Sequence, residues 1–166
     1  MSAVADLVVL AADKNMEFLL RAGFDRPEAL GIRPIDVRIQ VHPFSDGGVR
    51  TSGANVLSLL SRQYDHAVMV LDFEGSGATG SATDLESNLD AQLVPSWQDR
   101  AKAIVIEPER PKEAFESVLR QMKRPRSSAL YRRVGRTISL EKCTDPAFRR
   151  LRDRLRLWFP REHSGS

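Results

Sequence analysis

Two carboxylates one residue apart, Asp72 and Glu74, follow directly after the apolar run at residues 67–71. That run has the length and the β-branched content of a strand buried on both faces, as in a parallel sheet. Ligands of parallel α/β sheets bind outside the carboxyl ends of the strands, so both acids are expected at that edge. Neighbouring carboxylates repel each other, and a hard cation such as Mg²⁺ is a common reason to keep them together. The spacing therefore indicates a metal site with Asp72 and Glu74 as its principal ligands.

Other acids stand at the expected carboxyl ends of further strands. Asp13 follows the run at 7–11, and Glu107 and Glu109 follow the run at 102–106. In a parallel sheet these ends share one edge, and converging acids suit a divalent ion that polarises a phosphoryl oxygen or activates water. Mg²⁺ is the expected ion, with Mn²⁺ as its substitute in vitro. The competing interpretation is that polar residues occupy strand ends because loops are exposed.

The segment Gly75–Gly80 matches the pattern G-x-G-x-x-G between a strand and a helix. A dinucleotide site is disfavoured, because the adjacent acids would repel a pyrophosphate and the motif does not open the first βαβ unit. We expect Gly75 and Gly77 to give a flexible loop that lets the backbone approach a phosphate. A nucleotide-binding switch that uses this loop is an alternative.

A second glycine-containing segment, residues 42–53, is expected to form a loop before a helix that carries Val56, Leu59 and Leu60 on one face. Backbone N–H groups at that helix N-terminus, together with Arg50, could hold a phosphate. The Gly-Lys-Ser/Thr ending of a P-loop is missing. His42 is interpreted as a structural histidine, and an ordinary turn and helix cap is the competing interpretation of the loop.

Charge is divided unevenly along the chain. Of its 25 Lys and Arg and 22 Asp and Glu, residues 110–166 hold 16 basic and 6 acidic side chains, which leaves 9 basic and 16 acidic ones for residues 1–109. A basic C-terminal part favours an anionic partner, first of all nucleic acid, although solvated helix faces are an equally weighted interpretation. The candidate phosphate-binding residues there are Arg149, Arg150, Arg152, Arg154 and Arg156.

Four runs are typical of strands, at residues 7–11, 35–41, 67–72 and 102–106, and helical stripes lie between them. This alternation predicts an α/β fold with a mainly parallel, Rossmann-like four-stranded sheet flanked by helices. Pro95 is expected to end the helix before the last strand. Three apolar stripes after the strands, within residues 115–122, 130–138 and 148–158, predict a C-terminal helical extension. The expected division is 1–109 for the α/β domain, 110–160 for the basic extension and 161–166 for a loose tail.

The expected compartment is the cytoplasm. No apolar run approaches the ~20 residues that a membrane helix needs, and the first residues lack the basic start of a secretory signal. Cys143 is the single cysteine, so no internal disulfide is possible. Cys143 is interpreted as a partly buried spectator and not as a nucleophile.

The motifs together resemble a known family. A strand that turns into Ala11-Ala12-Asp13-Lys14, the Asp-x-acid at Asp72 and a strand that ends in Glu107-Pro108-Glu109 look like the Toprim-like group. More narrowly, they look like its small members encoded beside restriction–modification and other phage-defence genes, possibly a methylation-associated defence system. The resemblance covers roughly residues 5–109, and its motifs are short.

The resemblance implies a Toprim/Rossmann-like fold and a site in which a first-strand glutamate and an Asp-x-Asp pair hold Mg²⁺ for phosphodiester chemistry. Asp72 matches the first Asp and Glu74 stands at the second. Ala11 stands at the glutamate position, so Asp13 is a hypothetical substitute. The chain also continues after Glu109 with Arg110-Pro111-Lys112, where related chains are expected to carry a Trp-containing apolar segment.

The expected function is a component of a bacterial antiviral defence system that acts on or binds nucleic acid with a divalent metal. If it is an enzyme, it is a Mg²⁺-dependent phosphodiesterase or nuclease with Asp72, Glu74 and Asp13 as catalytic residues. Nucleic acid and other defence-system proteins are the expected partners. The alternative is a catalytically inactive scaffold or binding subunit with the same fold.

Overall fold

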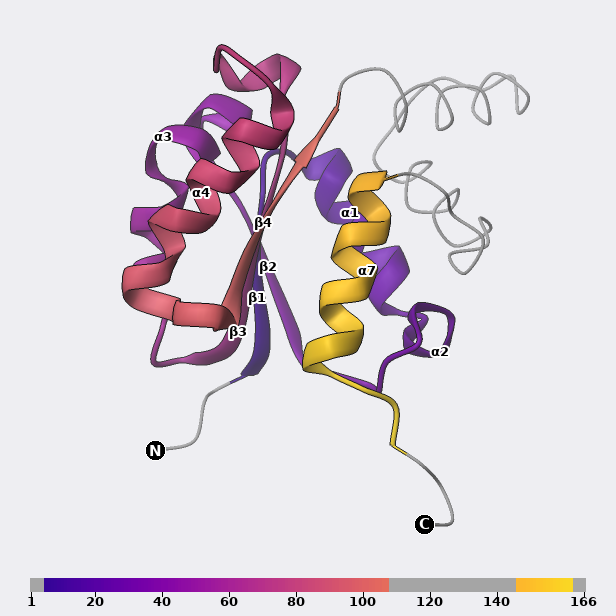
Figure 1. Ribbon diagram of the computed structural model, residues 1–166. Helices are drawn as coiled ribbons and strands as arrows, with labels where there is room; N and C mark the ends of the chain where they lie inside the picture. The colour runs from indigo at the N-terminus through magenta and orange to yellow at the C-terminus, as the bar shows by residue number, and fades with distance from the viewer. Residues whose placement is uncertain (1–4, 108–145, 163–166) are drawn as a thin grey trace, which may run out of the picture.

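A computed structural model describes residues 5–107 and 146–162 of the chain (Figure 1). Its centre is a four-stranded, all-parallel sheet in the order β2-β1-β3-β4. The strands are β1 (Ala5–Ala11), β2 (Val37–Val41), β3 (Tyr64–Asp72) and β4 (Ala101–Ile106). The predicted α/β fold with a four-stranded parallel sheet flanked by helices is confirmed, and so is a helix at the C-terminal side.

The order in which the chain adds strands to the sheet reverses between β1 and β3. Two helices, α1 (Lys14–Phe24) and α2 (Pro27–Leu30), connect β1 to β2 on one side, and α3 (Ser45–Ser58) then leads to β3 on the other side of β1. Such a reversal leaves a crevice outside the carboxyl ends of the two central strands, where open α/β sheets bind ligands. A ligand site is therefore expected at the carboxyl ends of β1 and β3.

Helices cover both faces of the sheet (Figure 1). On one face, α3 and α4 (Ala82–Trp97) pack over side chains such as Leu10 and Met69. On the other face, α1, α2 and α7 (Pro146–Trp158) pack over side chains such as Val9 and Val68. Neighbouring residues of a strand point to opposite faces, so the central strands are buried on both sides, as their continuous apolar runs predict.

Helix α7 is an integral layer of this α/β unit. Its side chains Leu151 and Leu155, with Phe159 just beyond it, belong to the same core as Val9 and Val68. Each fully buried side chain of this size contributes about 1.5–3 kcal/mol. The end of the predicted basic extension is therefore packed on the sheet. The predicted helices at 115–122 and 130–138, with Glu109 and Cys143, lie outside the described residues.

Three local predictions were wrong. Helix α3 begins at Ser45, within the stretch predicted to be a loop, and α4 continues through Pro95 to Trp97. Glycine is a poor helix former, but Gly48 lies against the ring of His42, where a side chain would collide with it, so close packing outweighs propensity. Leu59, which was expected on the buried face, is 81% exposed.

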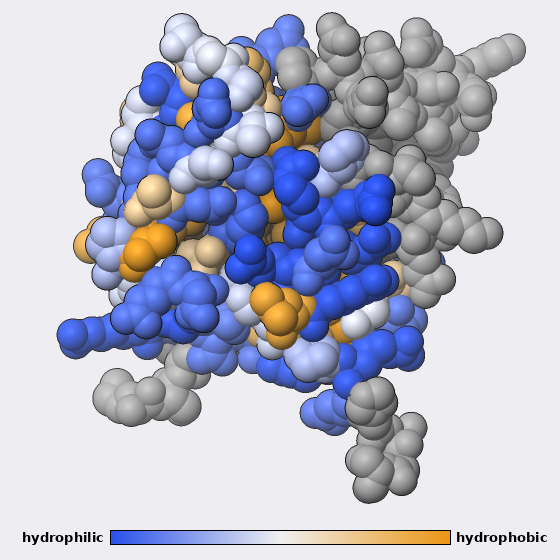
Figure 2. Space-filling model, viewed as in Figure 1, coloured by the Kyte–Doolittle hydropathy of each residue, from blue (hydrophilic) through white to orange (hydrophobic). Residues whose placement is uncertain are grey.

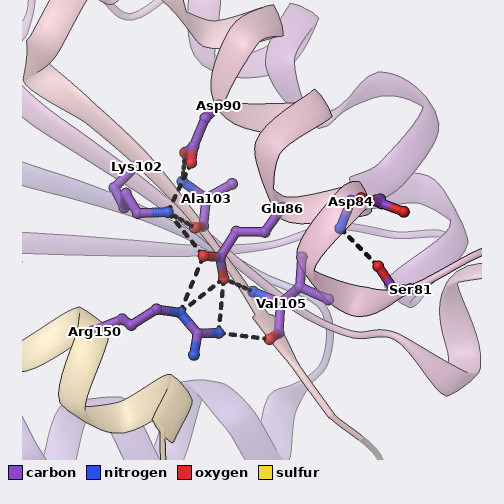
Figure 3. A network of polar contacts seen from close by, with 8 residues as sticks. All are labelled: Ser81, Asp84, Glu86, Asp90, Lys102, Ala103, Val105 and Arg150. Carbon is purple, nitrogen blue, oxygen red and sulfur yellow. Dashed lines mark hydrogen bonds and ion pairs between the residues drawn. The ribbon is translucent and has the colours of Figure 1, made fainter.

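The open edge of β4 is closed by side chains from α4 (Figure 3). The backbone N–H of Ala103 donates to Oδ1 of Asp90 at 2.8 Å, and the N–H of Val105 donates to Oε1 of Glu86 at 2.9 Å. An edge strand normally leaves such backbone groups unpaired, so that a strand of another protein chain can pair with them. Two carboxylates thus occupy donors that a further strand would need.

The carbonyl groups of the same edge are also occupied (Figure 3). Lys102 Nζ donates to the Ala103 oxygen at 2.7 Å, and Arg150 Nη2 of α7 donates to the Val105 oxygen at 3.1 Å. Arg150 also donates to both oxygens of Glu86, at 2.8–3.2 Å. Burial alone would raise the pKa of Glu86, but the bonds from Arg150 and Val105 and the charge of Lys102 outweigh burial and lower it.

A second contact fixes the other end of α7. The ring of His66, on β3, stacks on Trp158 with 4.3 Å between centroids and meets the edge of Phe159 at 5.1 Å. Burial lowers the pKa of His66 to about 4, with the nearby charge of Arg100 acting in the same direction. His66 is therefore neutral at physiological pH, because burial disfavours its charged form.

Candidate functional site

The carboxyl ends of β1 and β3 bring part of the predicted acidic set to one edge of the sheet. Asp72 is the last residue of β3, and Asp13 follows β1 by two residues. Asp13 is the N-cap of α1, and its Oδ1 accepts a hydrogen bond from the Met16 N–H at 2.8 Å. The exposed side chain of Asp13 thus already has a local function, because an N-cap satisfies a backbone donor of the first helical turn.

Asp46 is a site residue that the sequence reasoning missed. It lies in the first turn of α3, and its Oδ1 accepts a hydrogen bond from the Asp72 N–H at 2.8 Å. Its Oδ2 lies against Gly75, where any side chain would collide with it. Asp46 therefore connects the start of α3 to the end of β3 and to the turn that follows. The signal in the sequence was an acid in a segment that we interpreted as a loop.

The turn after β3 is tightly folded. Its backbone forms a single 3-10 turn, η1 (Glu74–Ser76), and the Ser76 hydroxyl donates to the Phe73 oxygen at 2.6 Å and accepts from the Ala78 N–H at 3.1 Å. Gly77 has φ +76°, a left-handed conformation that glycine adopts without strain. The glycines predicted to provide a flexible phosphate loop are accounted for here by local packing and turn geometry.

Arg50 reaches from α3 to this turn. Its Nε donates to the Ser76 oxygen at 2.6 Å, and its Nη2 lies beside Gly77. A guanidinium carries five N–H donors in a planar fork, so one bond to a carbonyl leaves it able to contact an anion as well. Arg50 lies in the second turn of α3, because the helix begins at Ser45, nine residues earlier than the predicted loop at residues 42–53 would allow.

His42 has the structural role that its sequence context predicts. It is buried at 5% exposure, its Nδ1 accepts from the Phe44 N–H at 3.0 Å, and its Nε2 lies 2.8 Å from Ser52 Oγ. The Ser52 hydroxyl donates to the Gly48 oxygen at 3.0 Å, which leaves it as the acceptor for His42. The imidazole therefore carries its proton on Nε2, and both ring nitrogens hold the β2–α3 connection in place.

The remaining predicted acids are more dispersed. Glu74 is exposed in η1, and Glu107 is exposed one residue beyond β4. In residues 5–107 and 146–162, no three His, Cys, Asp or Glu side chains form a group that could hold a metal ion. Mg²⁺ often takes only one or two protein carboxylates and completes its shell with water and phosphate oxygens. The hydrogen bond from the Asp72 backbone to the Asp46 carboxylate brings these two residues to the same edge, where a site of that open type would be located.

The arginines of α7 are largely engaged within the protein. Arg150 binds Glu86, Arg156 Nε donates to the Leu30 oxygen at 2.8 Å, and the guanidinium of Arg154 lies 5.7 Å from the Trp158 ring centre. Arg152 lies beside Asp153 with 12% of its side chain exposed. The face that carries α7 is strongly hydrophilic, and Arg149 is exposed (Figure 2). These contacts explain much of the basic stripe as the means by which α7 is fastened to the sheet.

No helix in the described part of the chain is long and apolar enough to span a membrane. Comparisons of the sequence with family models and with curated proteins, and of the structure with solved structures, found no match.

Proposed function

We propose that this protein is a Toprim-like component of a bacterial antiviral defence system that acts on or binds nucleic acid with a divalent metal at the β1/β3 edge. One observation carries the proposal: the Asp46 carboxylate accepts a hydrogen bond from the backbone of Asp72 at the point where the strand order reverses. Two acids from different elements thus lie where α/β folds bind ligands.

In this proposal, Asp72 and Asp46 hold the metal, with Glu74 on the adjacent turn as a further ligand. Ala11 stands at the position of the glutamate of the Toprim-like family, and Asp13 takes over the role of that glutamate. When bound, Mg²⁺ supplies polarisation of a phosphoryl oxygen. Arg50 orients a phosphate group of the nucleic acid next to the turn after β3. The reaction class is phosphodiester cleavage.

A non-catalytic binding or scaffold subunit is the second candidate. It is favoured by Ala11 on β1 and by the hydrogen bonds in which Asp13 and Asp46 already serve as acceptors for backbone groups. In that case, nucleic acid or another defence protein binds regardless of metal. A nucleotide-binding switch has no supporting contact in the described residues, because Gly75 and Gly77 are explained by the turn and by the contact with Asp46.

Calorimetric titration with Mg²⁺ and Mn²⁺ tests the metal site. Asp72→Asn removes the charge and keeps the shape, and Asp84→Asn is the matched control, since Asp84 is an exposed acid of α4. We expect the wild type and Asp84→Asn to bind metal and Asp72→Asn to lose that binding. Equal heats for all three proteins would contradict the metal site.

Cleavage of labelled DNA and RNA separates the two candidates. For an enzyme, products form with Mg²⁺, disappear with chelator and disappear in Asp72→Asn but not in Asp84→Asn. For a scaffold, the wild type binds the same oligonucleotides without products, and neither the chelator nor Asp72→Asn changes the affinity. Cleavage that persists in Asp72→Asn would reject this site as the source of the activity.

A further inference from the structure

The two edges of the sheet differ in how their backbone groups are satisfied. At β4, the carboxylates of Asp90 and Glu86 and the cations of Lys102 and Arg150 occupy the outward groups (Figure 3). At β2, the other end of the strand order, no strand lies further out and no side chain bonds to the strand backbone in residues 5–107 and 146–162. An open edge of this kind is a template for pairing with another strand.

The hydrogen bonds to β1 show which backbone groups of β2 point outward. The Leu7 N–H donates to the Asp36 oxygen at 3.1 Å, and the His42 N–H donates to the Ala11 oxygen at 2.9 Å. Successive residues of a strand direct their backbone groups to opposite sides, so every second residue from Asp36 to His42 bonds to β1. The residues between them direct both N–H and C=O away from β1, and these are Val37, Ile39 and Val41.

The neighbouring side chains leave this edge open. Helix α1 packs on the same face as β2, but its Glu17 bonds to Arg21 of the same helix at 2.7 Å. Arg38 Nε lies 3.5 Å from Asp36 Oδ1, so the charge of Arg38 is paired within its own segment. The outward-facing residues are all β-branched, a type that favours strand pairing, and each is only partly buried.

We propose that β2 is the interface of a two-fold symmetric dimer, in which β2 pairs antiparallel with β2 of a second copy and joins the two sheets. With the axis at Ile39, each Ile39 lies opposite the other, and Val37 of one copy lies opposite Val41 of the other. Every outward N–H and C=O of both strands then has a partner. A two-fold dimer is the commonest closed assembly, and it needs a surface that is complementary to itself.

The side chains of β2 fit this register better than either adjacent symmetric one. Arg38 lies opposite the neutral Gln40 of the second copy, so no like charges face each other directly. An axis at Arg38 would place two arginines opposite each other, which is destabilising. An axis at Gln40 would set Val37 against Pro43, which has no N–H to donate. This self-complementarity favours a second copy over an unrelated strand.

Analytical ultracentrifugation of the full chain, from low to high micromolar concentration, tests the dimer. We expect the mass to rise from that of one chain to twice 18.6 kDa. Ile39→Pro removes an outward N–H but no bond to β1, so the dimer loses two hydrogen bonds, one from each copy. Ile39→Ala is the matched control, because it loses the same side chain and keeps the N–H. We expect the dimer Kd of Ile39→Pro to be about 5- to 150-fold higher than that of Ile39→Ala.

Hydrogen exchange of the wild type, measured by NMR, gives an arm that does not depend on how a variant folds. The amides of Val37, Ile39 and Val41 should exchange more slowly as the protein concentration rises. The amides of Ala103 and Val105 are bonded to carboxylates of the same chain, so their exchange should not depend on concentration in this way.

Three outcomes would overturn the proposal. A monomer at every concentration with rapid exchange at β2 would mean that the edge stays open. A monomer with slow exchange there would mean that this chain covers its own edge. A dimer with equal Kd for Ile39→Pro and Ile39→Ala would place the association on another surface. None of these outcomes bears on metal binding at Asp72, so the dimer and the proposed function can fail separately.

Discussion

Replacement of Glu86 by Gln should release the tie between α4, β4 and α7. The carboxylate accepts hydrogen bonds from Val105 N–H, Lys102 Nζ and the Arg150 guanidinium at 2.8–3.2 Å. Only 13% of the Glu86 side chain and 12% of the Lys102 side chain are exposed. A glutamine keeps one acceptor oxygen for Val105, but its amide group turns N–H donors toward the two cations.

The magnitude follows from what the substitution leaves unpaired. Loss of one partner of a buried ion pair costs about 3–5 kcal/mol, and each hydrogen bond to a charged group contributes about 1.5–3 kcal/mol. Arg150 is 39% exposed, and Lys102 keeps a contact of 2.8 Å with Asp90, so both are partly compensated. We expect Glu86→Gln to lower the free energy of unfolding by about 2–4 kcal/mol.

Urea unfolding, followed by circular dichroism, measures this loss at pH 7. Asp84→Asn removes the same charge from an exposed position on the same helix and should cost no more than about 1 kcal/mol. Since the pKa of Glu86 is lowered in the fold, its contribution is complete above its ordinary pKa of 4.5 and is lost as the pH falls through the lower folded value. The difference between the wild type and Glu86→Gln should therefore shrink in acid. A Glu86→Gln protein as stable as Asp84→Asn at pH 7 would refute the reasoning.

Three further predictions concern stability. Gly47→Ala should stabilise the protein by about 0.5–1 kcal/mol, because a Cβ there makes only an ordinary contact, 3.9 Å from the Ser76 carbonyl oxygen, and alanine favours a helix. Gly48→Ala should destabilise it by about 1–3 kcal/mol, because that Cβ would collide with the His42 ring; the urea midpoints of the two variants should therefore shift in opposite directions. Leu155→Ala should cost about 2–5 kcal/mol in the same assay, since Leu155 has no exposed surface, and a loss below 1 kcal/mol would mean that α7 does not pack on the sheet. Folding favours the neutral form of His66, so the contribution of His66 to the free energy of unfolding is complete above pH 6.5 and is lost as the pH falls from 6.5 to about 4. We expect the free energy of unfolding to fall by on the order of 1–2 kcal/mol over this range. His66→Phe should remove this dependence of stability on pH.

The sheet could be predicted from the sequence because its signals are local. The continuous apolar runs in β1 and β3 and the regular strand–helix alternation suffice for a parallel sheet, and acids directly after such runs must lie at its carboxyl edge. Asp72 and Asp13 were placed there by this reasoning alone.

The other features depend on contacts that sequence spacing does not reveal. The start of α3 was missed because its glycines suggest a loop. In the structure, glycine is needed at position 48 because the His42 ring packs against the helix there. Asp46 was missed with it. The role of Arg150 depends on Glu86, 64 residues earlier, so a basic stripe that suggested phosphate binding includes an arginine that closes a sheet edge.

The position of α7 has a consequence for the order in which the protein can fold during synthesis. The face of the sheet formed by Leu7, Val9, Val68 and Ile104 is completed by side chains from residues 147–159. A ribosome must therefore synthesise residues 147–159 before that apolar surface is covered. Until then the nascent chain exposes an apolar surface that favours aggregation or chaperone binding.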